Sequence, residues 1–185
     1  MNMLIRFFIL LALLKQESKQ RPSADSVTTA QKPKLTQAEL FTPVSRSYRV
    51  LPHDMGFRDH LPNYRYLSFV ELNVTAWLYN ILKKNGLGGL SMDWIISMQE
   101  MVYLKQIKFL SKMTVTSTLE GWGEKYVYFQ HHFYVKNTLM AVGLTKFVLM
   151  NKKGKQLPSS IGMQGEHLTE VINTWNANQT AIKSQ

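Results

Sequence analysis

A long stretch with apolar residues around most of a helix constrains the fold of this chain more than any other feature. Residues 64–86 read YRYLSFVELNVTAWLYNILKKNG. Apolar side chains recur there with the spacing of one helix face, at Leu67, Val70, Val74, Trp77, Leu78 and Ile81. Three more widen that stripe, at Phe69, Leu72 and Leu82. A helix with so wide an apolar surface is buried on more than one side, so other elements must wrap it.

Local signals mark both ends of this helix. Asn63, which follows Pro62, is a predicted N-cap because its side-chain oxygen can accept a hydrogen bond from a free amide of the first turn. Lys83 and Lys84 suit the negative C-terminal end of the helix dipole, and Gly86 is a predicted C′ residue.

Beyond this helix the apolar period changes from 3.6 to 2, which predicts strands. The alternating runs are 92–103, 111–120, 125–136 and 138–150, and a shorter run at 45–52 precedes the helix. Turn residues separate them, so consecutive strands should form an antiparallel meander. The predicted fold class is α+β, with one long central helix wrapped by a curved antiparallel sheet of about five strands.

The chain divides into four predicted parts. Residues 1–14 are an apolar N-terminal segment, 15–43 a polar linker, 44–156 the folded domain, and 157–185 a C-terminal loop and helix. The first part has eight successive apolar residues, whereas a helix that spans a bilayer needs roughly 20. We expect residues 1–15 to form a helix that lies at a membrane surface or packs on its own domain.

Composition excludes several classes of site. The chain has no cysteine, which removes disulfides, thiolate nucleophiles and cysteine-bound zinc. No metal site is expected at His131 and His132 either, because neighbouring residues on a strand point to opposite faces. The net charge of +10 should attract anions such as phosphates, but the lysines are scattered and no nucleic-acid motif is present.

One stretch resembles a known family. Residues 49–67 read RVLPHDMGFRDHLPNYRYL. They are similar to the pattern R-V-x-P-x-D-x-D-x-x-x-H-x-N-N-x-R-Y-L of 4-hydroxybenzoyl-CoA-thioesterase-like hot-dog proteins, most of all the thioesterase-superfamily-member-6-like group. The matching positions are Arg49, Val50, Pro52, Asp54, His60, Asn63, Arg65, Tyr66 and Leu67. Downstream, LEGWGEKYVYFQHHF and LMAVGLTKFVL also resemble family strands, so the likeness covers about 45–155.

The resemblance implies a hot-dog fold and an acyl-thioester hydrolase. Two positions depart from the pattern: Gly56 replaces its second Asp, and Pro62 replaces the first of its paired Asn residues. In some relatives the acid at the Gly56 position is the catalytic carboxylate. The alternative interpretation is therefore a non-catalytic hot-dog protein that binds acyl groups or associates with a membrane.

Thioester hydrolysis needs a stabilised oxyanion and a carboxylate. The resemblance implies that backbone amides at the start of the central helix, near Asn63, Tyr64 and Arg65, hold the oxyanion, and a helix N-terminus suits that charge. His60 could bind the substrate, position a neighbouring acid or hold its loop together.

Three residues are candidates for the carboxylate. Asp54 matches the family's first Asp, although an Asp in a loop often bonds backbone amides instead. Asp59 lies beside His60 and could replace the lost acid, or be an exposed turn residue. Glu71 lies among apolar neighbours, which would raise its pKa, and in another hot-dog branch a helical Glu performs the attack. The sequence leaves all three open.

The expected substrate is a thioester of coenzyme A or of acyl carrier protein, with no cofactor. A hot-dog sheet leaves an edge strand that a second copy can pair with, so we expect a homodimer or a dimer of dimers. We expect a cytoplasmic protein, with possible membrane contact through residues 1–15.

Overall fold

The structure is a computed structural model that describes residues 2–20, 36–88 and 90–184. The helices are α1 (Asn2–Gln20), α2 (Gln37–Leu40), α3 (Pro52–Met55), α4 (Asn63–Lys84), the 3-10 helix η1 (Pro158–Ile161) and α5 (Glu170–Lys183). The strands are β1 (Val44–Arg49), β2 (Asp93–Tyr103), β3 (Lys112–Trp122), β4 (Val127–Val135), β5 (Thr138–Asn151) and β6 (Gly154–Gln156).

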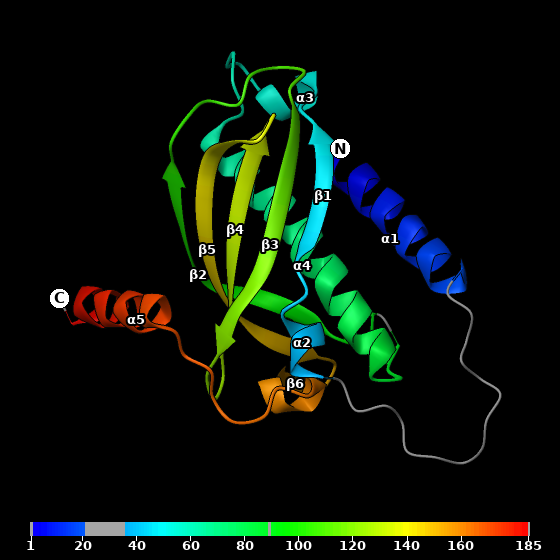
Figure 1. The fold of residues 1–185 in the computed structure, drawn as a ribbon, viewed down its shortest axis with the longest axis vertical. Coiled ribbons are helices and arrows are strands. Elements are labelled where there is room, and N and C mark those ends of the chain that lie inside the picture. The colour runs from blue at the N-terminus through cyan, green and yellow to red at the C-terminus, as the bar shows by residue number, and fades with distance from the viewer. Residues whose placement is uncertain (1, 21–35, 89, 185) are drawn as a thin grey trace.

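One antiparallel sheet curls around α4 (Figure 1). Its strand order is β1-β3-β4-β5-β2, and the short β6 pairs with β5. Strands β3, β4 and β5 form the predicted antiparallel meander. The meander prediction is wrong for the first two strands, because β1 pairs with β3 and β2 pairs with the far side of β5. This arrangement confirms the predicted α+β fold with a wrapped central helix, and it leaves β1 and β2 at the two edges.

The concave face of the sheet and the buried sides of α4 form one apolar core. Alternate residues of β3 and β4 point inward, so that Val115, Leu119, Phe129 and Phe133 are fully or almost fully buried. Trp77 of α4 meets Phe129 edge-on, with ring centroids 4.9 Å apart. The indole nitrogen of Trp77 donates to the carbonyl of Leu40, so its one polar atom is paired inside the core.

A chain of polar side chains crosses this core. His131 is fully buried between two hydroxyls, with its Nδ1 2.8 Å from Ser117 Oγ and its Nε2 2.9 Å from Thr145 Oγ1. The Asn73 amide donates to Ser117 Oγ and accepts from the Tyr48 hydroxyl. Burial lowers the pKa of His131 to about 3, so the ring is neutral at physiological pH.

The two ends of α4 differ from one another in how they are capped. Asn63 is the first helical residue and Pro62 holds the N-cap position without a side-chain hydrogen bond, so the predicted Asn63 cap is wrong by one position. At the other end Gly86 has φ +70, as predicted for a C′ residue. The amide of Gly86 donates to the carbonyl of Lys83 and that of Leu87 to Leu82, which closes a Schellman motif.

Helix α1 lies alongside α4 and next to β1 (Figure 1). It runs to Gln20, six residues past the apolar segment that ends at residue 14. Leu10 and Leu14 are buried against the domain, and the polar residues that follow continue the helix. Most of the predicted linker, residues 21–35, lies outside the described residues. Residues 37–40 of that range form α2, which opens with a Thr36–Glu39 capping box.

The outer face of α1 is apolar and exposed, at Leu4, Ile5, Phe8, Ile9 and Leu13. In the described part of the chain, no helix combines the length and apolar character needed to cross a bilayer. Contact of residues 1–15 with a membrane surface stays a prediction.

Helix α5 packs on the opposite, convex face of the sheet. Ile172 and Trp175 form a small second cluster with Tyr128 of β4. Lys146 of β5 joins them, since its ammonium group lies 4.3 Å from the centre of the Tyr126 ring and donates to the side chains of α5. The site described next lies on the other side of the sheet, beside α4.

Candidate functional site

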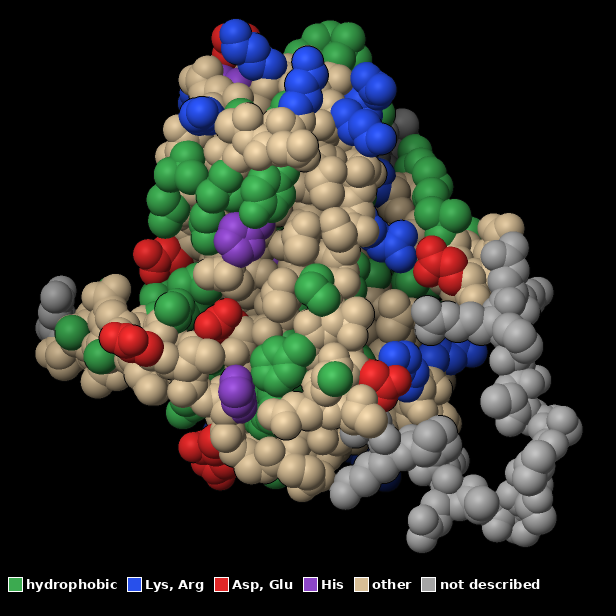
Figure 2. All heavy atoms as spheres, in the orientation of Figure 1, with side chains coloured by type: hydrophobic (Ala, Val, Ile, Leu, Met, Phe, Trp, Pro, Cys, Tyr) green, Lys and Arg blue, Asp and Glu red, His purple; other side chains and the backbone are tan. Residues whose placement is uncertain are grey.

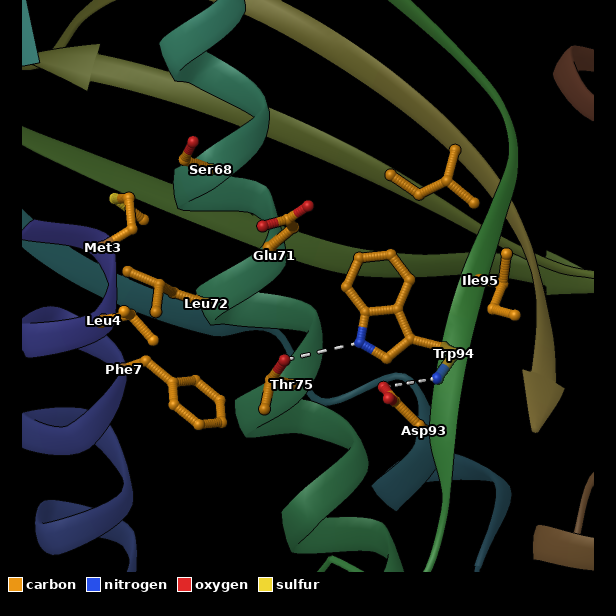
Figure 3. A pocket seen from close by; sticks show the side chains of 11 residues that line it. Met3, Leu4, Phe7, Ser68, Glu71, Leu72, Thr75, Asp93, Trp94 and Ile95 are labelled. Carbon is orange, nitrogen blue, oxygen red and sulfur yellow. Dashed lines mark hydrogen bonds between the residues drawn. The ribbon is translucent and has the colours of Figure 1, made fainter. Parts of the chain in front are cut away.

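A pocket of about 620 Å³ opens between α1, α4 and β2 (Figure 3). Each of the three elements supplies one wall. The lining residues are Met3, Leu4 and Phe7 of α1, Ser68, Glu71, Leu72 and Thr75 of α4, and Asp93, Trp94, Ile95 and Ile96 of β2. Most of this lining is apolar, with a few polar groups from α4 and the Asp93 carboxylate from β2, which is the usual character of a site for an organic ligand.

Glu71 is the candidate carboxylate that lines this pocket. Its side chain remains open to solvent at the pocket mouth, and partial burial raises the pKa of the carboxyl above its usual value. Within the described residues, no group donates a hydrogen bond to this carboxylate. A carboxylate with a raised pKa and no bound donor has the properties of a general base or a nucleophile.

Two hydroxyl groups lie one turn to either side of Glu71 on the same face of α4, because residues three and four apart are neighbours on a helix. Ser68 precedes it and Thr75 follows it, and both line the pocket. Figure 3 shows Phe7 and Trp94 directed toward Thr75 from opposite sides. The Trp94 indole N–H donates to Thr75 Oγ1 at 3.4 Å, which ties the edge strand to the helix.

Asp54 lies in a different place. It is completely buried at the end of α3, and its Oδ2 accepts from Arg6 Nη2 at 2.7 Å and from the Leu51 amide at 2.9 Å. Arg6 also donates to the carbonyl of Arg49. The Asp54 carboxylate therefore holds α1 to the turn that precedes α4.

Asp59 and His60 form a pair at the surface. Their side chains are 2.7 Å apart, and the Asp59 side chain is 87% exposed. The hydrogen bond with His60 lowers the pKa of the Asp59 carboxyl. The backbone of His60 forms a bridge with Lys108, so the pair belongs to the contact between this loop and the β2–β3 connection.

The first turn of α4 is accessible but distant from Glu71. Tyr64 is 61% exposed, and Arg65 donates to the His53 carbonyl. Asn63 is exposed and its carbonyl accepts from the Tyr103 hydroxyl at 3.3 Å. Eight residues separate Asn63 from Glu71, which is about 12 Å along a helix. One chain alone therefore does not bring the Glu71 carboxylate to these amides.

Gly56 has a backbone that other residues rarely adopt. Its φ is +62, and a Cβ built on it would lie 3.2 Å from the Tyr64 hydroxyl. Glycine at this position is what the turn between α3 and α4 requires.

The structure thus separates the predicted site residues into three groups: Glu71 in the pocket, Asp54 in the core, and Asp59, His60, Asn63, Tyr64 and Arg65 around the exposed start of α4. Sequence reasoning missed Ser68, Thr75, Asp93 and Trp94. Helical spacing from Glu71 could have identified the two hydroxyls, whereas nothing local to Asp93 and Trp94 shows that β2 lies beside Glu71. Within the described ranges, no cluster of three metal-ligating side chains occurs.

A family model described as the thioesterase-like superfamily matches residues 50–168. In the comparison with curated proteins, no sequence matches. Among solved structures, the chain is similar to YbaW, a probable thioesterase from Escherichia coli, with TM-score 0.56 and 17% identity over 64% of this chain and 92% of that one. It is also similar to SAV2348 from Staphylococcus aureus in complex with CoA, with TM-score 0.56 and 13% identity over 73% of this chain and 83% of that one.

A third similar structure is DHNA-CoA thioesterase from Staphylococcus aureus, with TM-score 0.53 and 10% identity over 77% of this chain and 91% of that one. At such identities these structures establish the fold, and the narrower resemblance to the member-6-like group stays a prediction. The family model, in contrast, matches more than half of the residues, and so the chain belongs to the thioesterase-like superfamily.

Proposed function

We propose that this protein hydrolyses acyl thioesters, with Glu71 as the carboxylate that acts on the thioester. The observation that carries the proposal is the position of Glu71: it lines an apolar pocket, accepts no hydrogen bond from the described residues and has a raised pKa. Asp54 is bound by Arg6, and Asp59 by His60 at the surface. These contacts favour structural roles for both.

The reaction follows from the properties of that carboxylate. Glu71 takes a proton from a water molecule, whose oxygen adds to the thioester carbonyl. As the tetrahedral intermediate collapses, the carbon–sulfur bond breaks and the proton held by Glu71 passes to the departing thiolate. Direct attack by the carboxylate, with an anhydride that water then opens, gives the same products. Ser68, one turn before Glu71, is within reach to donate to the developing oxyanion.

A second copy of the chain would complete this site. Along β2, Asp93 to Ile96 lie beside the Glu71 pocket, whereas Tyr103 lies beside the start of α4. Two β2 edges related by a twofold axis pair antiparallel, which sets the Asp93 end of one against the Tyr103 end of the other. Such pairing brings the free α4 amides of one copy toward the Glu71 pocket of its partner. Exposed Ile95 and Val102 on β2 support burial of this edge.

The nucleotide part of a coenzyme A substrate has a suitable surface near the same edge. Lys and Arg side chains gather at the end of the molecule that carries α3 (Figure 2). Lys105, Lys108 and Lys112 are exposed there in and after the β2–β3 connection. Phosphates, or the acidic surface of an acyl carrier protein, would be attracted to this end.

The experiment compares hydrolysis of acyl-CoA and acyl carrier protein thioesters by the full chain and by Glu71→Gln. We expect Glu71→Gln to lower kcat by about 10²- to 10⁴-fold while Glu124→Gln, an exposed carboxylate in the β3–β4 turn, keeps wild-type activity. Val102→Arg, an exposed edge residue outside the pocket, should convert a dimer to monomers in light scattering and lower activity as well. Wild-type protein that turns over no thioester of either kind would exclude the hydrolase.

A non-catalytic acyl-binding protein is the second candidate. The observation that favours it is Gly56, which stands where some relatives carry their catalytic acid. Saturable binding of acyl-CoA without turnover by the wild type, unchanged in Glu71→Gln, would support this candidate instead.

A further inference from the structure

The Glu71 pocket continues along α4 into a second cavity. That cavity has a volume of about 260 Å³ and is lined on α4 by Thr75, Leu78 and Tyr79. Four residues line both cavities, namely Phe7, Thr75, Asp93 and Trp94. The two spaces therefore adjoin at the level of Thr75, one helical turn beyond Glu71.

Two aromatic side chains flank the shared boundary. Phe7 extends from α1 and Trp94 from β2, both toward Thr75 (Figure 3). Trp94 is fixed there by its hydrogen bond to Thr75 and by packing on Phe147, with ring centroids 5.2 Å apart. Phe7 is partly buried and projects from a helix that lies outside the residues matched by the family model.

The Glu71 pocket and the second cavity together form a groove along α4. Its length gives the number of acyl carbons that it can hold. From Glu71 to Thr75 is four residues, or about 6 Å, and from Glu71 to Tyr79 is eight residues, or about 12 Å. An extended chain advances about 1.2 Å per bond, as an extended backbone does. A chain that starts at a carbonyl beside Glu71 reaches the Phe7–Trp94 boundary after about five carbons and the end of the groove after about ten.

Helix α1 keeps its place through contacts that do not involve the groove. Arg6 is bound by the buried Asp54 at 2.7 Å, and its guanidinium lies 5.2 Å from the centre of the Phe69 ring. Leu10 and Leu14 are buried one and two turns further on. Phe7, next to Arg6, is therefore held at a set height above α4.

From these observations we propose that α1 is the outer wall of the acyl-binding groove, and that Phe7 with Trp94 controls how readily an unbranched acyl chain longer than about five carbons passes into the second cavity. This inference rests on the proposed hydrolase for the position of the carbonyl. The ligand is a medium-length acyl group of about ten carbons, whose tail passes between the two aromatic rings.

The test is a chain-length series of straight-chain acyl-CoAs, from two to sixteen carbons (an even-numbered ladder of about eight substrates), with the full-length protein. Wild-type kcat/KM should rise by up to about fourfold per methylene, the ratio expected for burial of one methylene, and level off near ten carbons. Phe7→Ala opens the boundary, so kcat/KM for chains of about six to ten carbons should rise relative to butanoyl-CoA, while the preferred length stays near ten carbons because the groove still ends at Tyr79. Phe7→Trp should lower kcat/KM beyond about six carbons and leave butanoyl-CoA unaffected.

The matched control is Phe8→Ala, the same deletion at the next residue of α1. The Phe8 ring is 63% exposed and meets Phe7 edge-on from the solvent side. Its chain-length profile should equal that of the wild type. Circular dichroism melts of all variants establish that α1 remains folded, and Phe7→Leu replaces Phe7→Ala if the latter melts early.

A binding measurement separates this inference from the proposed hydrolase. Decanoate binding, followed by calorimetry, should weaken by about 15-fold in Phe7→Trp, the value of about two methylenes of lost contact, and remain unchanged in Phe8→Ala, whether or not the protein turns over thioesters. Turnover with the same chain-length profile in Phe7→Ala, Phe7→Trp and the wild type overturns the inference and leaves the hydrolase intact. Phe7-dependent decanoate binding without any turnover removes the hydrolase and keeps the groove. A protein that shows no turnover and binds no decanoate rules out both the hydrolase and the groove.

Discussion

Replacing Asp54 by Asn should lower the stability of the protein far more than its activity. Asp54 matches the first Asp of the thioesterase pattern, and its carboxylate lies in the core. Its Oδ2 accepts two hydrogen bonds, from Arg6 at 2.7 Å and from the Leu51 amide at 2.9 Å. The variant keeps the size and one acceptor of the side chain but removes the charge that pairs with Arg6.

The expected cost follows from the burial of both partners. The Asp54 and Arg6 side chains are 0% and 15% exposed, so the pair is screened little by water. Removing one partner of a buried pair costs about 3–5 kcal/mol, and the oxygen that Asn retains places Asp54→Asn near 3 kcal/mol. In a chain of this length that lowers Tm by about 6–12 °C. Arg6→Met keeps the stem above Phe69 but strands the carboxylate, so it should cost at least as much.

The assay is urea unfolding of both single variants and of the Arg6→Met/Asp54→Asn double variant. Since the two residues share one interaction, the double variant should be more stable than the sum of the single losses predicts, by about 1.5 kcal/mol or more. Thioester hydrolysis is measured well below each Tm. A coupling near zero would refute the structural role, and so would an Asp54→Asn variant that melts like the wild type and has lost its activity.

Three further predictions concern pH and backbone strain. Because the pKa of Glu71 is raised, kcat/KM should fall as the pH drops through that pKa. Glu71→Gln should be more stable than the wild type at neutral pH, and this difference in stability should disappear in acid, where Glu71 is protonated. His131 is buried and neutral with a pKa of about 3, so between pH 6.5 and that value only the unfolded state takes up its proton. The free energy of unfolding should therefore drop by about 2 kcal/mol between pH 7 and pH 5. Equal pH slopes for the wild type and His131→Gln would contradict this. Gly56→Asp restores the acid of the family pattern at a φ of +62, so thermal melts should show a loss of about 1–3 kcal/mol and hydrolysis assays no gain.

Local periodicity was sufficient to predict most of the fold. The apolar stripe of α4 and the alternation in β3 and β4 report directly which side of each element is buried, because the repeat of side-chain direction is set by the backbone. Turn residues predicted an antiparallel meander, which the structure has in β3, β4 and β5 but not in β2, which pairs with β5. The C-terminal end of α4 was predicted from a local signal as well, because the positive φ of Gly86 depends on local backbone geometry alone.

Long-range pairs were not predictable in this way. Arg6 and Asp54 are 48 residues apart, and neither position carries a signal for the other. The same holds for Trp94, which meets Thr75 only because β2 returns to the edge of the sheet beyond β5. The three candidate carboxylates differ in such long-range contacts, which no local signal in the sequence shows.

These contacts also link the turn that carries Gly56 in place of the family's acid to the N-terminal helix α1. The turn before α4 has a glycine backbone at position 56, and its nearest acid, Asp54, is occupied with Arg6. That turn therefore serves to hold α1 in place. Once held, α1 covers one side of α4 and converts the surface around Glu71 into an apolar pocket, where burial raises the pKa of the carboxyl. The same ion pair that occupies the loop acid thus contributes to the apolar surroundings of Glu71, the carboxylate that we propose acts on the thioester.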